Sequence, residues 1–300
     1  MFAALASALV LAIAPQDGPP AAPTQEQPAG QLDDVLVDGR RLEDAARAFI
    51  EEVGAPPPGT RPGRWNSEIC VSVTGMQPRF AQLMIDQIAR RALDVGVDVE
   101  APGCRPNVII LATDDGRALA SSLVEDAGLG FQPAHSSTNL TRSALRRFRT
   151  SRAPVRWWHV TIPVLVATGE PAIAFKGQPA PTVTVRDASR LRSNIRYDIG
   201  WVVIVIDMSR TGNASFGALS DYVAFATLTQ LDATADTSRD DTILNLFEEN
   251  RQVTGLTDWD RDYLAALYTS RTDRATIGQQ LNDLVRSLTD IRRSSVEAGD

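Results

Sequence analysis

The two cysteines of this chain, Cys70 and Cys104, flank a single amphipathic segment and restrict how this part of the sequence can fold. A short apolar strand is predicted over 69–73 and a second over 108–112, with Gly96 between the segment and the second strand. The segment between the strands carries apolar residues at helical spacing, namely Phe80, Met84, Ile85, Ile88 and Ala92. Strand, helix and strand in this order predict a right-handed parallel crossover.

This crossover predicts a disulfide bond. Cys70 lies near the start of the first strand and Cys104 lies just before the second, so both sulfur atoms fall at the same end of the strand pair. Closing that loop would stabilise the fold by roughly 3 kcal/mol. Disulfides persist in oxidising compartments, which favours a secreted or periplasmic protein, whereas two free buried thiols would fit a reducing compartment.

The N-terminal residues 1–14 form an apolar run that ends in Ala12-Ile13-Ala14, a pattern typical of a signal-peptide cleavage site. No basic residue precedes the run and Pro15 follows it, so cleavage as late as residue 22 also fits. A buried N-terminal helix is the alternative, but the Pro/Ala/Gln-rich linker over 15–40 would separate it from the core. No later apolar run approaches the length of a membrane span, so we expect no transmembrane segment after processing.

The rest of the chain predicts one α+β domain with a mixed sheet. An amphipathic helix is predicted over 41–54, and the Pro/Gly-rich tract over 55–63 separates it from a domain over 64–295, with a possible sub-boundary near residue 210. Further strands are predicted over 160–167, 182–186 and 201–207, and the C-terminal third is predicted to be helical. Pro163 indicates an edge or irregular strand. Capping boxes are expected at three pairs: Ser238/Asp241, Thr257/Asp260 and Ser270/Asp273.

Charge and motifs exclude several functions. The 37 acidic residues outnumber the 30 basic ones, for a net charge of -7, which argues against nucleic acid as a partner. The segment 213–217 resembles the nucleophile elbow of α/β-hydrolases, but both histidines, His135 and His159, precede its Ser215. The same two histidines are too far apart to share one helix face in a zinc site. We therefore expect neither a metal nor another cofactor.

An arginine-rich segment that runs into two tryptophans is the first candidate site. A cationic, aromatic surface could bind an anionic glycan, a peptidoglycan fragment or a lipid headgroup. The alternative is a solvated loop that leads into a strand, with one tryptophan in the core. The candidate ligand-binding residues are Arg146, Arg149, Arg156, Trp157, Trp158 and Tyr197.

Aspartates near strand ends are the second candidate site. Asp114 and Asp115 follow the strand predicted over 108–112, where parallel sheets commonly bind ligands. Asp207 and Asp221 are further possible contributors to a hydrolase that acts through carboxylates. The alternative is a capped turn, because Asp and Gly favour turns for local reasons.

Five blocks resemble segments of uncharacterised exported proteins of Gram-negative bacteria: ICVSVTG, PGCRPNVIILATDDG, RWWHVTIP, SDYVAFATLTQLD and LTDWDRDYLAALY. Most of the mature chain is covered, but the resemblance implies no activity. A strand followed by a helix over 218–230 is also similar in layout to secreted zincin-like peptidases, whose helix carries HExxH. The stretch 220–224 has neither histidine, so this likeness implies a peptidase-like scaffold without its metal site.

These observations predict a non-catalytic binding or envelope-associated protein that is secreted or periplasmic. The competing hypotheses are a carboxylate-dependent hydrolase and a degenerate peptidase-like scaffold. A binding protein predicts an exposed aromatic and cationic patch, whereas a hydrolase predicts a cleft in which two carboxylates converge. The ligand and the oligomeric state do not follow from the sequence.

Overall fold

The computed structural model describes residues 30–135, 138–182, 184 and 189–299. The predicted signal peptide over 1–14, its later cleavage point near residue 22 and the start of the predicted linker lie outside these residues. The chain divides into two units, residues 1–38 and 39–300, and the sheet with the helices that cover it belongs to the second. Helix α1 (Gly30–Val53) begins before the predicted residue 41, so the end of the predicted linker is helical.

After α1 the chain forms both helices and strands up to residue 207, and it is mainly helical after residue 215. In order they are β1 (Val71–Thr74), α2 (Pro78–Asp94), β2 (Val108–Thr113), α3 (Gly116–Asp126), α4 (Gly128–Phe131), α5 (Arg142–Thr150), β3 (Val155–Leu165), β4 (Ile195–Asp207), α6 (Phe216–Leu228), α7 (Asp258–Thr269) and α8 (Ile277–Gly299). Short 3-10 turns occupy Met208–Arg210 and Ile243–Asn245.

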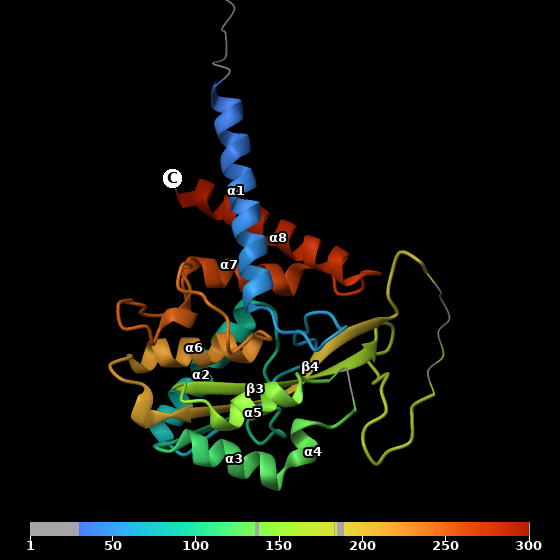
Figure 1. Cartoon of the computed structure of the whole chain (residues 1–300), viewed down its shortest axis with the longest axis vertical. Coiled ribbons are helices and arrows are strands. Elements are labelled where there is room, and N and C mark those ends of the chain that lie inside the picture. The colour runs from blue at the N-terminus through green and yellow to red at the C-terminus, as the bar shows by residue number, and fades with distance from the viewer. Residues whose placement is uncertain (1–29, 136–137, 183, 185–188, 300) are drawn as a thin grey trace, which may run out of the picture. The chain divides into compact units, whose positions relative to one another are not determined.

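The sheet is mixed, with the strand order β1-β2-β4-β3. β1, β2 and β4 are parallel, and β3 pairs antiparallel to β4 at one edge (Figure 1). This arrangement confirms the predicted α+β class with a mixed sheet. It also confirms the edge strand that Pro163 indicated, since a residue without a backbone N–H is tolerated where one side of a strand has no strand partner.

The predicted crossover is present and carries the disulfide. β1 and β2 pair in parallel from Val71 opposite Val108, with α2 between them in the chain. Cys70 and Cys104 are bonded across this end, with their Cα atoms 6.0 Å apart. Asn107 strengthens the same end, because its Oδ1 accepts the backbone N–H of Cys70 at 2.8 Å.

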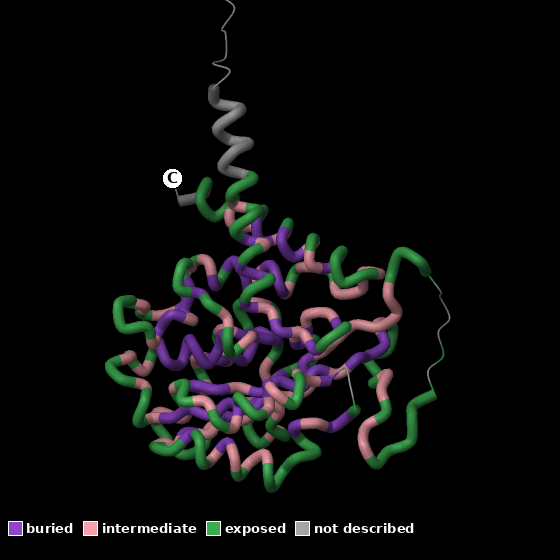
Figure 2. The backbone as a smooth tube through the Cα atoms, in the orientation of Figure 1, coloured by how far each residue is buried: buried purple, intermediate pink, exposed green. Residues whose placement is uncertain are grey.

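Helices cover both faces of the sheet. On one face a large core joins Met84 of α2, Phe225 of α6 and Leu264 of α7 to the inward side chains of the strands. On the other face a smaller core joins Phe148 of α5 to Trp158 of β3, with α3 beside them. Helix α6 lies within the larger core, and Figure 2 shows it buried along its length. Its sequence explains this position, because apolar residues occupy most of its circumference and such a helix is stable when it is enclosed.

Three predictions about individual elements change in the structure. β3 begins at Val155 rather than at residue 160 and β4 begins at Ile195 rather than at 201, because the two strands form a long antiparallel pair that extends beyond their apolar stretches. The strand predicted over 182–186 lies largely outside the described residues. Of the three predicted capping boxes only Thr257/Asp260 forms, at the start of α7. Ser270 instead ends α7, and Ser238 bonds to Asp236 within a turn.

Candidate functional site

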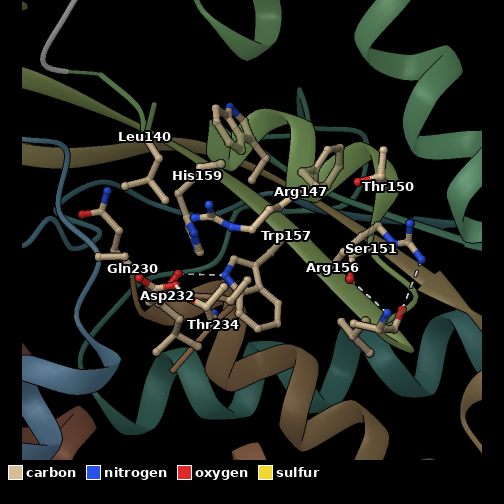
Figure 3. A pocket seen from close by; sticks show the side chains of 18 of the residues that line it. Leu140, Arg147, Thr150, Ser151, Arg156, Trp157, His159, Gln230, Asp232 and Thr234 are labelled. Carbon is tan, nitrogen blue, oxygen red and sulfur yellow. Dashed lines mark hydrogen bonds between the residues drawn. The ribbon is translucent and has the colours of Figure 1, made fainter. Parts of the chain in front are cut away.

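A groove follows the open edge of β3 and encloses about 290 Å³. Residues 155–159 of β3 form one side, α5 and the residues after it form a second, and the segment 230–234 forms a third (Figure 3). Its lining is largely apolar, with Tyr222 of α6 among the aromatic side chains. We call this feature the β3 groove. Its volume is close to the lower end of the range for ligand pockets.

The wall over 230–234 is held in place by backbone and side-chain bonds. Leu231 forms an antiparallel bridge with Gly54, and the N–H of Ala55 donates to the carbonyl of Gln230 at 3.1 Å. The indole Nε1 of Trp157 donates to the carbonyl of Leu231 at 3.0 Å, which fixes the distance between this wall and β3. The groove is therefore formed before any ligand arrives, which reduces the entropy cost of binding.

Backbone hydrogen bonds at both ends of β3 show which residues face the open edge. At its start, the carbonyl of Pro154 accepts the N–H of Asp207 in β4 at 2.7 Å, so the even-numbered residues bond to β4. Further along, the N–H of Thr161 points away from β4 and donates to the carbonyl of Thr138 at 2.7 Å. Because the bonding direction alternates along a strand, the odd-numbered residues face outward.

Val155, Trp157 and His159 are the odd-numbered residues that line the β3 groove. Within the described parts of the chain, no other residue hydrogen-bonds to the outward N–H and C=O groups of these three. Unpaired strand edges readily pair with another chain, and proteins normally cover them or shorten them. This edge is instead flanked by walls on both sides, and an extended chain that pairs with β3 is the occupant that its unpaired backbone groups suit.

His159 is held neutral inside the groove. It is 7 % exposed, and its Nε2 lies 2.8 Å from the carbonyl oxygen of Ala226 in α6. A carbonyl oxygen only accepts, so Nε2 carries the proton and Nδ1 is the free acceptor. Loss of hydration on burial lowers the pKa of His159 to about 4, and the bond to Ala226 only partly opposes this. The imidazole is therefore uncharged at neutral pH.

This pKa predicts a loss of stability in mild acid. The unfolded chain binds a proton on His159 below its ordinary pKa of 6.5, whereas the folded protein resists that proton until about pH 4. Stability is therefore unaffected by this group above pH 6.5 and falls as the pH decreases from 6.5 to about 4, and the accumulated loss is about 3 kcal/mol. We expect the free energy of unfolding in urea to depend less on pH between 6.5 and 4 in His159→Gln than in the parent. The exposed His135→Gln is the matched control, and an equal slope in all three proteins would contradict the prediction.

The structure separates the residues of the predicted arginine and tryptophan surface. Arg146 is exposed on α5, and Arg149 is engaged by Glu125 at 2.5 Å. Trp157 and Trp158 point to opposite faces of the sheet, as neighbours on a strand must. Tyr197 pairs with Pro163 at the other end of β4.

Three of these six residues line the β3 groove: Arg156, Trp157 and Trp158. Trp158 is 3 % exposed and packs against Phe131 and Phe148, so most of its ring belongs to the core. Its Nε1 donates to the carbonyl of Phe131 at 2.7 Å. The alternative in which one tryptophan is a core residue therefore describes Trp158.

Three of the four predicted aspartates meet at a second hollow. Asp114, Asp115 and Asp207 line about 310 Å³ at the carboxyl ends of β2 and β4, which we call the β2–β4 hollow. Asp115 caps α3 by accepting the N–H of Ala118 at 2.9 Å. Asp207 is buried and accepts the N–H of Gly116 at 3.1 Å. These two carboxylates are thus used in holding α3 against the sheet.

Gly116 permits this close approach. A Cβ atom at this position would lie 2.9 Å from the Cβ of Asp207, closer than packed atoms tolerate. Asp207 also accepts the hydroxyl of Ser209 at 2.6 Å. The carboxylate of Asp207 is therefore held at both oxygens, by Gly116 and by Ser209.

Asp221 lies apart from the other three aspartates, between α2 and α6. Arg91 binds it through Nε at 2.8 Å and Nη2 at 3.1 Å, and Gln87 donates to it as well. Burial alone would raise the pKa of Asp221, but the hydrogen bonds from Arg91, Gln87 and the N–H of Leu256 outweigh it and hold the pKa below its ordinary value. A carboxylate held ionised in this way is suited to stabilising the fold rather than to proton transfer.

The described residues contain neither a candidate metal site nor a candidate membrane span. No group of three or more histidine, cysteine or acidic side chains there could hold a metal ion. No helix in that part of the chain is both long and apolar enough to cross a membrane. Comparison of the chain with family models, curated proteins and solved structures finds no match.

Proposed function

We propose that this protein is a secreted or periplasmic, non-catalytic binding protein that takes up an extended polypeptide as an added strand along β3. The observation that carries the proposal is the row of outward, unpaired backbone groups at Val155, Trp157 and His159 inside a walled groove. Main-chain bonds would supply affinity that is independent of the ligand sequence. Side chains of the added strand would alternate between the two walls, which supplies selectivity.

The sides of the groove suit such a ligand. Apolar side chains of α5 and β3 offer surface for alternate residues of the peptide, and Tyr222 adds an aromatic contact from α6. The compartment is supported by the disulfide, because a bond of this kind persists under oxidising conditions.

Two observations favour binding over catalysis. The helix that lies under the groove, α6, carries Ser220, Asp221 and Ala224 where the zincin-like layout would place its catalytic residues. In the described chain, Asp221 is hydrogen-bonded to Arg91, Gln87 and the N–H of Leu256, and His159 to the carbonyl of Ala226, so neither is bonded to a serine, threonine or cysteine that it could activate. A peptidase-like scaffold that retains peptide binding without cleavage is consistent with both.

The experiment uses a library of short random peptides with free carboxyl ends. Peptides captured by the purified protein are identified by mass spectrometry, and their affinities are measured by fluorescence anisotropy. The test variant is Ala233→Trp, because Ala233 is exposed and lines the β3 groove, so a larger side chain obstructs the slot without disturbing the core. We expect this variant to bind the captured peptides at least about tenfold more weakly than the parent does.

The matched control is Ala101→Trp, at an exposed alanine that does not line the groove. It should bind the captured peptides as the parent does. Equal affinity of both variants, or no captured peptide, would contradict the proposal. Peptides recovered in cleaved form would instead support the hydrolase alternative.

A further inference from the structure

We infer that the β2–β4 hollow binds the terminal carboxylate of the polypeptide that lies in the β3 groove. This inference rests on the proposed function and names its ligand class, a peptide with a free carboxyl end. It starts from Arg156, which lines both the groove and the hollow.

Arg156 is a buried cation with unused donors. It is 3 % exposed, its Nη2 donates to the carbonyl of Ala153 at 3.2 Å, and the same atom lies 4.0 Å from Asp207. Its Nε and Nη1 have no hydrogen-bond partner within the described chain. A buried polar group without a partner costs free energy, so an acceptor that enters here would be stabilised. A carboxylate is such an acceptor, and bonds between it and a guanidinium are among the strongest in proteins.

The surrounding charges favour an anion. The hollow is lined by four arginines, at 117, 152, 156 and 210, and by three aspartates. Arg117 and Arg152 are exposed, and no described residue pairs with either. Two of the three carboxylates, Asp115 and Asp207, are already bonded to the start of α3. These bonds leave both carboxylates charged, and Nε of Arg210 lies 3.5 Å from Asp207. The lining as a whole therefore carries one more positive than negative charge, and Arg117 and Arg152 remain available to an anion.

The position of the hollow selects which end of a peptide reaches it. Ser151 and Arg156 line both features, so the hollow adjoins the groove where β3 begins. A strand added antiparallel to β3 ends at this point with its carboxylate, whereas a parallel strand would begin there with its ammonium. The arginines attract the first and repel the second, and antiparallel pairing is also somewhat more stable.

The test compares each captured peptide with the same peptide made as a C-terminal amide. The parent protein should bind the acid at least about tenfold more tightly than the amide. Arg156→Gln and Arg152→Gln should each lower this ratio, and the first should bring it close to one. Arg142→Gln is the control, since Arg142 is exposed on α5 and lines neither feature, so it should keep the parent ratio.

Arg152→Gln keeps the test valid if the buried Arg156→Gln fails to fold, because Arg152 is exposed and has no partner to lose. Inorganic phosphate should weaken binding of the peptide with a free carboxyl end and leave binding of the C-terminal amide unchanged. Equal affinity of the acid and the amide for the parent protein would overturn the inference about the hollow and leave the proposed function of the groove intact. A hollow that binds phosphate without affecting either peptide would be a separate anion site, and that result also overturns it. Failure to capture any peptide would overturn the proposed function first.

Discussion

Replacing Asp221 by alanine is expected to lower the free energy of unfolding by about 4 kcal/mol. The carboxylate accepts both Nε and Nη2 of Arg91, the amide of Gln87 and the backbone N–H of Leu256, and it is buried. Its removal leaves the guanidinium without its main partner and a buried N–H without any. Losses of this size follow when one member of a buried ion pair is truncated.

Chemical denaturation of the Asp221→Ala variant at neutral pH measures this effect. Asp86→Ala is the matched control, because Asp86 is exposed on α2 and, among the described residues, bonds only to Gln82. The pKa of Asp221 is lowered in the folded protein, so its contribution is present above the ordinary pKa of 3.8 and is lost as the pH falls below that value. This window lies below that of His159, which allows the two to be separated. A loss under about 1 kcal/mol at neutral pH would contradict the account of Asp221 as a structural anion.

The second large effect concerns the disulfide. Replacing Cys70 and Cys104 together by serine is expected to lower the free energy of unfolding by about 3 to 4 kcal/mol, because the bond closes a loop with a sequence separation of 34 residues. The effect arises in the unfolded chain, which has a higher conformational entropy without the bond.

Urea unfolding of the double serine variant, and of the parent before and after reduction, measures this contribution. The reduced parent should match the variant, since both lack the bond. A parent that is equally stable when reduced would contradict the role assigned to this link.

The sequence predicts the parts of the fold that depend on local pattern. The crossover from β1 to β2 follows from apolar periodicity, and the disulfide follows from the placement of two cysteines at one end of it. The capping box at Thr257 and Asp260 forms because it precedes a true amphipathic helix. The pairs at Ser238 and Ser270 also have the residue types of a capping box, but no helix begins directly after either serine.

The sequence does not predict the groove, because its sides come together only through tertiary packing. Leu231 reaches β3 through its bridge to Gly54 and its bond from Trp157, and none of these contacts has a local signal. The sequence pattern places Arg156 and Asp207 in two different candidate sites, yet they meet at one hollow because β3 and β4 are neighbours in the sheet. An edge strand next to a long apolar helix is the one feature that could have pointed to the groove.

The β3 groove is tested most directly by residue-level amide hydrogen exchange, with and without a captured peptide. On binding, the N–H groups of Val155, Trp157 and His159 should become protected, because each gains a partner in the added strand. Those of Arg156, Trp158 and Val160 should change little, because they face β4. Protection that follows this alternation would support strand addition, and unchanged exchange at the three outward residues would contradict it.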